Sequence, residues 1–314
     1  MAIRLKICVL LCVLSVPATA FSQADARGMV SAFSVTPDIP STFTWGGETV
    51  TLDRFDMRER FDRELTGFCF NHTNTLLVIK RANRYFPILK PILEETGLPE
   101  DFLYLAVIES FLNPRAVSSA KAGGMWQIMP ATGKGLGLEV NDYVDERFNI
   151  VKSTRVACQY LKSAYDKYGS WITAAASYNA GQQRITSELD KQFQNHAFDL
   201  WLNDETSRYI FRLMAIKAIM ENPVQYGFVL RREQLYPQIR FREMEVTESI
   251  DDLSRFANEQ GITYSQLKEF NSWLRDRKLP VANNSSYMIL IPYTEDLFYS
   301  SNKQPAYDKR WTID

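Results

Sequence analysis

The sequence predicts a mainly α-helical protein, in which an all-α domain is followed by a small βααβ module. Three observations lead to this fold class. Apolar residues recur at helical spacing from about residue 55 to residue 222, and no strand-like alternation of any length interrupts them. Asn222 and Pro223 end this pattern. Beyond Gly227, two short apolar runs typical of strands enclose two short helical patterns.

Residues 1–20 have the pattern of a secretory signal peptide. A basic start is followed by an apolar run over residues 7–16 and by an Ala-x-Ala site at residues 18–20. The apolar run falls well short of the ~20 residues that span a bilayer. Cys12 lies inside this run without a small residue just before it, so we expect no lipid anchor. We therefore expect an exported chain, located in the periplasm or cell envelope, whose mature form begins near Phe21 and has no transmembrane segment.

The composition excludes several classes of protein. Of the 314 residues, 46% are apolar and 23% are charged, as in soluble globular proteins, so the bulk of the chain is not disordered. Lys and Arg number 36 against 37 Asp and Glu, and no long basic run occurs, so we expect no nucleic-acid partner. The two His and four Cys do not have the spacing of zinc ligands.

Removal of the leader leaves two cysteines, Cys69 and Cys158. Export would permit a disulfide between them. Both lie in apolar helical contexts, however, and we expect two buried free thiols.

The helical domain is expected over residues 55–227, after an extended lead-in at residues 21–54. One amphipathic run opens at residues 76–80, and another at residues 88–93 is ended by Gly97 and Pro99. The further helices expected are residues 100–110, 149–168, 171–179 and 207–221.

Residues 228–293 are expected to form a linker and the βααβ module, and residues 294–314 a C-terminal tail. The strands are expected at residues 239–242 and 288–292, and the helices at 251–260 and 264–271.

Three short segments of the helical domain contain candidate functional residues. The first is Glu109-Ser110, where a lone carboxylate ends a helix rich in Leu, Ile and Val. The second runs over residues 123–130 and contains Gly-Gly-Met-Trp-Gln, and the third is Ser-Tyr-Asn-Ala-Gly at residues 177–181. Taken singly each is weak, since a Glu at a helix end is usually a solvated surface residue.

In combination, the three segments resemble the soluble lytic transglycosylase (SLT) domain, whose pattern reads E-S, then G-L-M/W-Q-x-x-P, then A-Y-N-A-G. Met125 stands where Leu is usual, and Ser177 stands where Ala is usual. The similarity extends over about residues 75–227. It is greatest to the membrane-bound lytic murein transglycosylase D subgroup, through residues 97–106, 145–147 and 205–209.

The resemblance implies a lysozyme-like catalytic domain that acts on the glycan strands of peptidoglycan. Such an enzyme cleaves the MurNAc-β-1,4-GlcNAc bond and leaves 1,6-anhydro-MurNAc ends, with Glu109 acting first as acid and then as base. No metal or cofactor is implied. The resemblance also assigns substrate contacts to Ser118 and Glu205.

The residue chemistry agrees with this interpretation. A carboxyl in an apolar setting has its pKa raised, which suits a general acid. The two glycines let the backbone come close to a ligand. Met125 and Trp126 offer apolar faces to a sugar ring, and Gln127, Tyr178 and Asn179 offer hydrogen bonds.

Two alternatives remain open. A muramidase on the same scaffold would use water, held by Asp142, Asp145 or Glu146. A non-catalytic protein would use the same residues only to bind peptidoglycan, without cleaving it.

The C-terminal module resembles a lysin motif (LysM), a small fold that binds N-acetylglucosamine chains. The supporting residues are Val246, Leu253, Phe256, Leu267, Asn271 and the apolar run at residues 289–292. The usual Gly-Asp before the first helix is absent. The module therefore either binds sugar or only packs on the catalytic domain.

Overall fold

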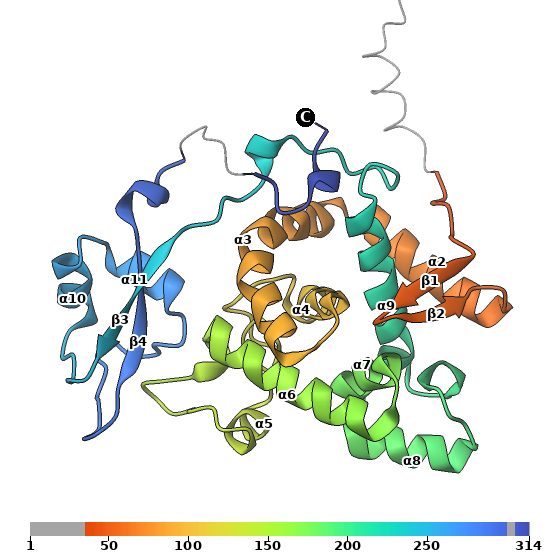
Figure 1. Cartoon of the computed structure of the whole chain (residues 1–314), viewed down its shortest axis with the longest axis horizontal. Coiled ribbons are helices and arrows are strands. Elements are labelled where there is room, and N and C mark those ends of the chain that lie inside the picture. The colour runs from red at the N-terminus through yellow and green to blue at the C-terminus, as the bar shows by residue number, and fades with distance from the viewer. Residues whose placement is uncertain (1–34, 300–304, 314) are drawn as a thin grey trace, which may run out of the picture. The chain divides into compact units, whose positions relative to one another are not determined.

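The computed structural model describes residues 35–299 and 305–313. The leader expected at residues 1–20 lies outside this part of the chain. The expected fold class is confirmed: the described residues are mainly helical, with two small two-stranded sheets (Figure 1). From Pro37 onward the described residues form one compact unit. Within the described ranges, no helix combines the length and apolar character needed to cross a membrane.

The lead-in contains a β-hairpin. β1 (Thr42–Trp45) pairs antiparallel with β2 (Glu48–Thr51), and Gly46 and Gly47 make the turn with φ of 57° and 84°. Turns with two positive φ angles match the twist of hairpin strands, and glycine adopts them without strain. Trp45 is buried, and the Gly46 amide donates to the Asp101 carboxylate at 2.6 Å. The hairpin is thereby part of the main core.

Eight α-helices make up the described helical domain. They are α2 (Phe55–Phe70), α3 (His72–Thr96), α4 (Leu103–Ser110), α5 (Pro130–Gly135), α6 (Ile150–Tyr168), α7 (Trp171–Ala180), α8 (Gln182–Gln192) and α9 (Asp204–Glu221). Short 3₁₀ turns η1 (Glu100–Phe102) and η2 (Glu146–Phe148) precede α4 and α6.

Two features differ from the expected helices. The runs at residues 76–80 and 88–93 belong to one helix, α3, which continues through Pro87 and Pro91. Proline removes a helical hydrogen bond, but one face of α3 is buried along its length, and this packing offsets the loss. Helices α2, α5 and α8 were not among the expected helices. In α8 the apolar stripe is weak, because Ile185 is its only buried residue.

Helix α4 lies at the centre of the helical domain, next to α3 and α9 (Figure 1). Every residue of α4 except Glu109 is buried. A helix that is apolar on all sides is stable only inside a core. Glu109 is therefore held by a helix that the rest of the domain surrounds.

The C-terminal module has the expected βααβ order. β3 (Phe241–Val246) pairs antiparallel with β4 (Tyr287–Pro292), and α10 (Leu253–Glu259) and α11 (Tyr264–Phe270) lie between them in sequence. β3 begins two residues later than expected and is longer. The apolar core of the module also includes Val144 and Phe148 from the helical domain. The two parts thus share a core at this point.

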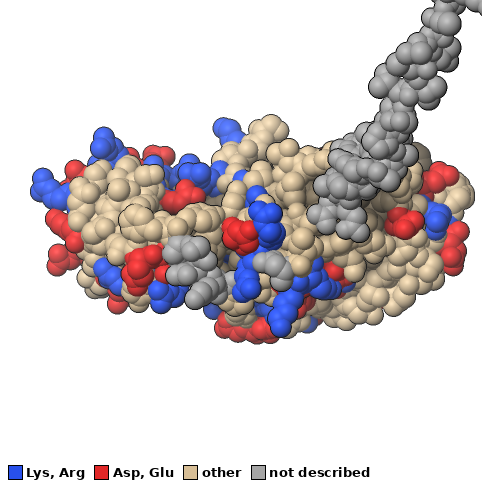
Figure 2. All heavy atoms as spheres, turned by 90° about the horizontal axis from the view of Figure 1, so that it is seen from above, with Lys and Arg blue, Asp and Glu red and all other residues tan. Residues whose placement is uncertain are grey.

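The end of the chain returns to the helical domain. Trp311, in the turn η6 (Lys309–Trp311), is 2% exposed and donates from Nε1 to the Met220 carbonyl at 2.8 Å. Its ring also contacts Phe86, with the ring centroids 5.9 Å apart. The predicted tail is therefore a packed segment in its described part. On the face shown in Figure 2, acidic and basic side chains are interspersed, in keeping with the net charge of −1.

We expect Trp311→Ala to lower the free energy of unfolding by about 3–5 kcal/mol, because it removes a buried indole and leaves a cavity. Urea-induced unfolding measures this change. Phe298→Ala is the control, since Phe298 is 76% exposed in the same C-terminal segment; its change should stay within about 0.5 kcal/mol. Equal losses in the two variants would contradict the packing of the tail.

Candidate active site

Glu109 is the centre of the candidate site. It is half-buried at the end of α4, and the Tyr209 hydroxyl of α9 donates to its Oε1 at 2.5 Å. Burial raises the pKa of Glu109 to about 7, whereas the Tyr209 hydrogen bond and the charge of Arg212 act to lower it. The negative charge of Glu205 acts in the raising direction. A carboxyl with a pKa near 7 can both give and accept a proton at neutral pH.

The local backbone explains why this carboxyl is poorly stabilised as an anion. Helix α4 ends at Ser110, one residue after Glu109, and the next two residues, Phe111 and Leu112, adopt the left-handed conformation with φ of 51° and 55°. The C-terminal end of a helix carries partial negative charge, which disfavours a nearby carboxylate. The end of the helix therefore acts on the pKa in the same direction as burial.

Residues 121–128, which we call the 121–128 loop, are hydrogen-bonded to the surroundings of Glu109. The Met125 carbonyl accepts from the Ser110 hydroxyl at 2.8 Å. The Trp126 carbonyl accepts from the Tyr178 hydroxyl at 2.8 Å. Gln127 has a φ of 48°, and its Nε2 donates to the Gly124 carbonyl at 2.8 Å. The position of the loop is thus tied to α4 and α7.

The expected role of Met125 and Trp126 needs correction. Their side chains are 1% and 0% exposed, and Trp126 donates from Nε1 to Thr154 at 2.8 Å. Buried side chains cannot present apolar faces to a sugar ring. They anchor the 121–128 loop in the core instead.

The two glycines of the loop also serve a different purpose from the one expected. A Cβ at Gly124 would lie 1.9 Å from the carbonyl oxygen of Arg147. A Cβ at Gly123 would lie 3.1 Å from the guanidinium carbon of Arg147 and 3.0 Å from the Phe148 ring. The close approach that requires glycine is therefore made by Arg147 and Phe148, and a ligand is not needed to explain it.

Tyr178 and Asn179 lie in the last turn of α7. Burial raises the pKa of Tyr178 well above its usual value, and the nearby charge of Glu109 adds to this. Asn179 accepts from the Thr206 hydroxyl through Oδ1 at 2.9 Å. Glu205, the neighbour of Thr206, is exposed. Tyr178 and Glu205 therefore lie near Glu109, and Asn179 is bonded to the residue next to Glu205.

Ser118 and Gln127 use their side chains within the protein. The Ser118 hydroxyl accepts from the Ala122 amide at 3.0 Å, in the turn that leads into the 121–128 loop. Gln127 donates to two backbone carbonyls, those of Gly124 and Ala116. Both side chains are half-buried.

The sequence analysis missed the most direct partner of Glu109. Tyr209 belonged to the segment at residues 205–209 that carried the resemblance, but it was not identified as a site residue. Tyr209 could have been predicted from its spacing, because it follows Glu205 by four residues and the two side chains therefore lie on one face of α9.

Two of the carboxylates considered for a water-using mechanism are engaged elsewhere. Asp145 accepts from the Arg147 guanidinium through both oxygens, at 2.9 and 2.7 Å. Glu146 forms an ion pair with Lys152 and accepts from the Glu139 amide. Both side chains are buried, whereas Asp142 is exposed.

Cys69 and Cys158 are both buried and free, as expected. Among the residues that the structure describes, no group of three or more His, Cys, Asp or Glu side chains is placed to hold a metal ion.

Comparisons with known families confirm the resemblance seen in the sequence. Residues 87–200 match the transglycosylase SLT domain family. Residues 242–295 match the soluble lytic transglycosylase C-terminal LysM-like domain family.

This chain is similar in sequence to two proteins that are named membrane-bound lytic murein transglycosylases. It is 26% identical over 284 residues to membrane-bound lytic murein transglycosylase D of Escherichia coli (strain K12), a match that covers 87% of this chain and 61% of that protein. It is 25% identical over 175 residues to membrane-bound lytic murein transglycosylase C of Haemophilus ducreyi, covering 51% of this chain and 47% of that one. The chain thus spans less than two thirds of the length of either relative.

Solved structures with some likeness include two lytic transglycosylases. The 70 kDa soluble lytic transglycosylase SLT70 of Escherichia coli is 19% identical, with a TM-score of 0.39 over 54% of this chain and 31% of that one. An inactive mutant of the lytic transglycosylase Slt of Pseudomonas aeruginosa is 23% identical, with a TM-score of 0.38 over 45% of this chain and 24% of that one.

The raised pKa of Glu109 predicts a pH-dependent stability. The pKa rises from an ordinary value of 4.5 to about 7 on folding, so the folded state retains the proton more strongly. Wild-type stability relative to Glu109→Gln is therefore full below about pH 4.5 and falls as pH rises towards 7, by up to about 3 kcal/mol. Urea unfolding of both proteins at several pH values tests this. The exposed Glu59→Gln is the control, and a pH-independent difference between wild type and Glu109→Gln would contradict the raised pKa.

Proposed function

We propose that this chain, which contains a transglycosylase SLT domain followed by a LysM-like domain and is homologous to membrane-bound lytic murein transglycosylase D, is an exported lytic transglycosylase. In this proposal it cleaves the MurNAc-β-1,4-GlcNAc bond of peptidoglycan glycan strands and leaves 1,6-anhydro-MurNAc ends. The observation that carries the proposal is the half-buried carboxyl of Glu109, whose pKa of about 7 suits proton transfer in both directions.

In the first step, protonated Glu109 gives its proton to the glycosidic oxygen while the bond from C1 of MurNAc to that oxygen breaks. GlcNAc leaves with a free 4-hydroxyl. The N-acetyl group of MurNAc assists by stabilising the positive charge that develops at C1. In the second step, the Glu109 carboxylate takes the proton of the C6 hydroxyl as this oxygen forms a bond to C1. The proton given is thereby recovered, and no water is consumed.

Tyr209 is a positioning residue in this scheme. Its hydroxyl holds Oε1 of Glu109 at 2.5 Å and leaves the other carboxyl oxygen for the substrate. Because a hydrogen bond to a carboxylate favours the charged form, Tyr209 also keeps the pKa of Glu109 from rising further. Tyr178, Asn179 and Gln127 would contact the sugar from the neighbouring segments.

The hydrolytic alternative needs a second carboxylate to hold water. Asp145 and Glu146 are engaged with Arg147 and Lys152. Glu205 is the carboxylate whose charge acts on Glu109, so it is the group to test for this role. A non-catalytic binding protein would have no use for a carboxyl with a raised pKa, because the burial of that group opposes folding at neutral pH.

Mass spectrometry of digested sacculi tests the proposal. We expect wild-type protein to release muropeptides with 1,6-anhydro ends. Glu109→Gln should lower the rate at least about a hundredfold, because a positioned acid typically contributes 10²–10⁴-fold and the same group serves both proton transfers. The matched control is Glu205→Gln, which should lose less activity because Glu205 positions substrate and moves no proton.

Three outcomes would contradict the proposal. Reducing ends that carry an added water would identify a muramidase. Protein that binds sacculi without releasing products would identify a binding protein. A Glu205→Gln variant that loses activity while Glu109→Gln keeps it would show that the acid is misassigned.

A further inference from the structure

We propose that Arg147 is a positioning residue that holds the 121–128 loop in the geometry required for substrate binding, and that the LysM-like module supports it through Asp145. The inference rests on the proposed function, because it assigns the loop to the substrate site. It gives the C-terminal module a structural part in the activity that does not depend on sugar binding.

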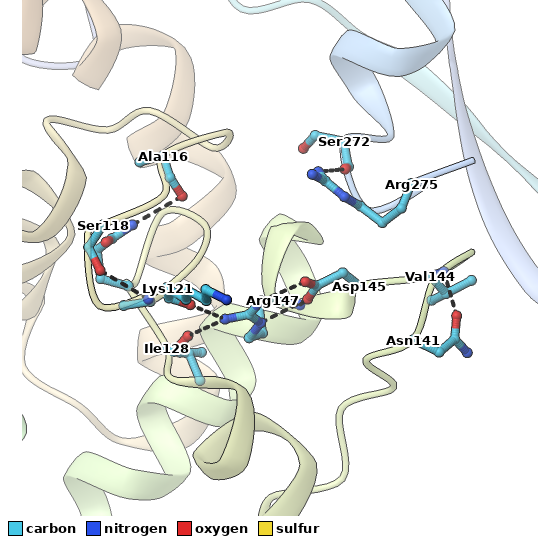
Figure 3. A network of polar contacts seen from close by, with 12 residues as sticks. Ala116, Ser118, Lys121, Ile128, Asn141, Val144, Asp145, Arg147, Ser272 and Arg275 are labelled. Atoms are coloured by element: carbon cyan, nitrogen blue, oxygen red, sulfur yellow. Dashed lines mark hydrogen bonds and ion pairs between the residues drawn. The ribbon is translucent and has the colours of Figure 1, made fainter. Parts of the chain in front are cut away.

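The Arg147 guanidinium lies between an acidic partner and both ends of the loop (Figure 3). On one side it binds both carboxylate oxygens of Asp145. On the other side its Nη1 donates to the Lys121 carbonyl at 2.7 Å and to the Ile128 carbonyl at 3.0 Å. One nitrogen therefore joins the first and the last residue of the loop, and the side chain is buried while it does so.

The loop has a backbone that needs such support. Lys121 and Gln127 have positive φ angles of 66° and 48°, although neither is glycine. This conformation is sparsely populated for residues with a side chain, and it persists where the surroundings impose it. Arg147 holds Lys121 itself and Ile128, the neighbour of Gln127.

The loop is in turn bonded to the surroundings of the acid. Ser110, the residue after Glu109, donates to the Met125 carbonyl, and Tyr178 donates to the Trp126 carbonyl. A displacement of the loop would therefore alter the setting of Glu109 and Tyr178 together.

The LysM-like module is hydrogen-bonded to the backbone around Asp145. The Asp145 amide donates to the Trp273 carbonyl at 2.9 Å, and the Arg275 amide donates to the Tyr143 carbonyl at 2.8 Å. The Ser272 hydroxyl donates to the carbonyl of Phe148, whose ring belongs to the module's core. The segment at residues 272–275 thus fixes the backbone on both sides of Asp145.

Lysine cannot replace arginine in this role. The guanidinium is a planar fork with five donors, so it can bind a carboxylate with two bonds and still reach two carbonyls. A lysine ammonium keeps the charge but cannot span these acceptors. Because a buried ion pair adds little net stability relative to apolar residues of the same size, fixing the loop geometry is the better account of Arg147.

Hydrogen–deuterium exchange without substrate is the first test. Amides of the loop donate within it or to its base, from Gly123 to Ile128, from Ile128 to Gly123 and from Gly124 to Ala116. In Arg147→Lys we expect exchange over residues 121–128 to be at least about tenfold faster, because the loop opens more often. The control is Lys217→Gln, which breaks a buried ion pair with Asp101 outside the loop and should leave exchange in residues 121–128 unchanged. Unchanged exchange in Arg147→Lys would overturn the inference.

Kinetics on sacculi are the second test. We expect Arg147→Lys to lower kcat/KM by about tenfold to a hundredfold, since small misplacements of binding groups have effects of this size. Because Arg147 acts through the loop, adding Gln127→Ala should cause little further loss. Lys217→Gln should keep most of the activity at temperatures where it stays folded. Independent, multiplicative losses from Arg147→Lys and Gln127→Ala would contradict action through a shared loop.

Asp145→Asn provides a milder variant should Arg147→Lys not fold. It removes the charge but keeps the shape, so we expect smaller changes of the same sign in exchange and in kcat/KM. Unchanged exchange in this variant would likewise overturn the inference. Failure of the proposed function would look different: wild type would release no anhydro products, while the exchange experiment would still report whether Arg147 holds the loop.

Discussion

The burial of the Glu109 carboxyl at the end of α4 is the constraint on which the rest of the structure depends. A carboxylate with a pKa of about 7 opposes folding at neutral pH, so the fold must supply compensating interactions. Helix α4 supplies them by burying all of its residues except Glu109 against the neighbouring helices. Tyr209 then supplies the hydrogen bond that fixes the carboxyl. The burial that makes Glu109 costly for folding also raises its pKa, and the proposed role in proton transfer depends on that raised pKa.

The 121–128 loop depends for its geometry on residues outside the surroundings of Glu109. Its glycines make room for Arg147, and Arg147 joins the ends of the loop. Asp145 connects this arrangement to the C-terminal module, whose core includes Phe148. The module and the site are therefore parts of one continuous polar and apolar network.

The sequence predicted features that neighbouring residues determine, and it was less informative about features that depend on tertiary packing. The helical periodicity, the glycine and proline stops and the βααβ order could all be predicted, because each is set by neighbouring residues. Glu109 could be proposed as the acid because its segment and those at residues 123–130 and 177–181 together resemble the SLT pattern, whereas the carboxylate alone would not have distinguished it. The burial of Met125 and Trp126 could not be predicted, because both residue types occur in protein cores and in sugar-binding surfaces. Only the three-dimensional packing determines which of these applies. The partners of Glu109 and Arg147 were missed for a related reason, as Tyr209 lies 100 residues from Glu109 in sequence.

The pH dependence of kcat/KM in wild type and in Tyr209→Phe tests the central claim most directly. The claim is that Glu109, tuned by burial and by Tyr209, is the acid of the reaction. In wild type, kcat/KM should fall as pH rises through about 7, because the free enzyme loses the proton that the first step requires. Removal of the Tyr209 hydroxyl removes an interaction that lowers the pKa, so the fall should move to higher pH in Tyr209→Phe. A fall at the same pH in both proteins would show that Glu109 is not the group whose protonation controls the reaction.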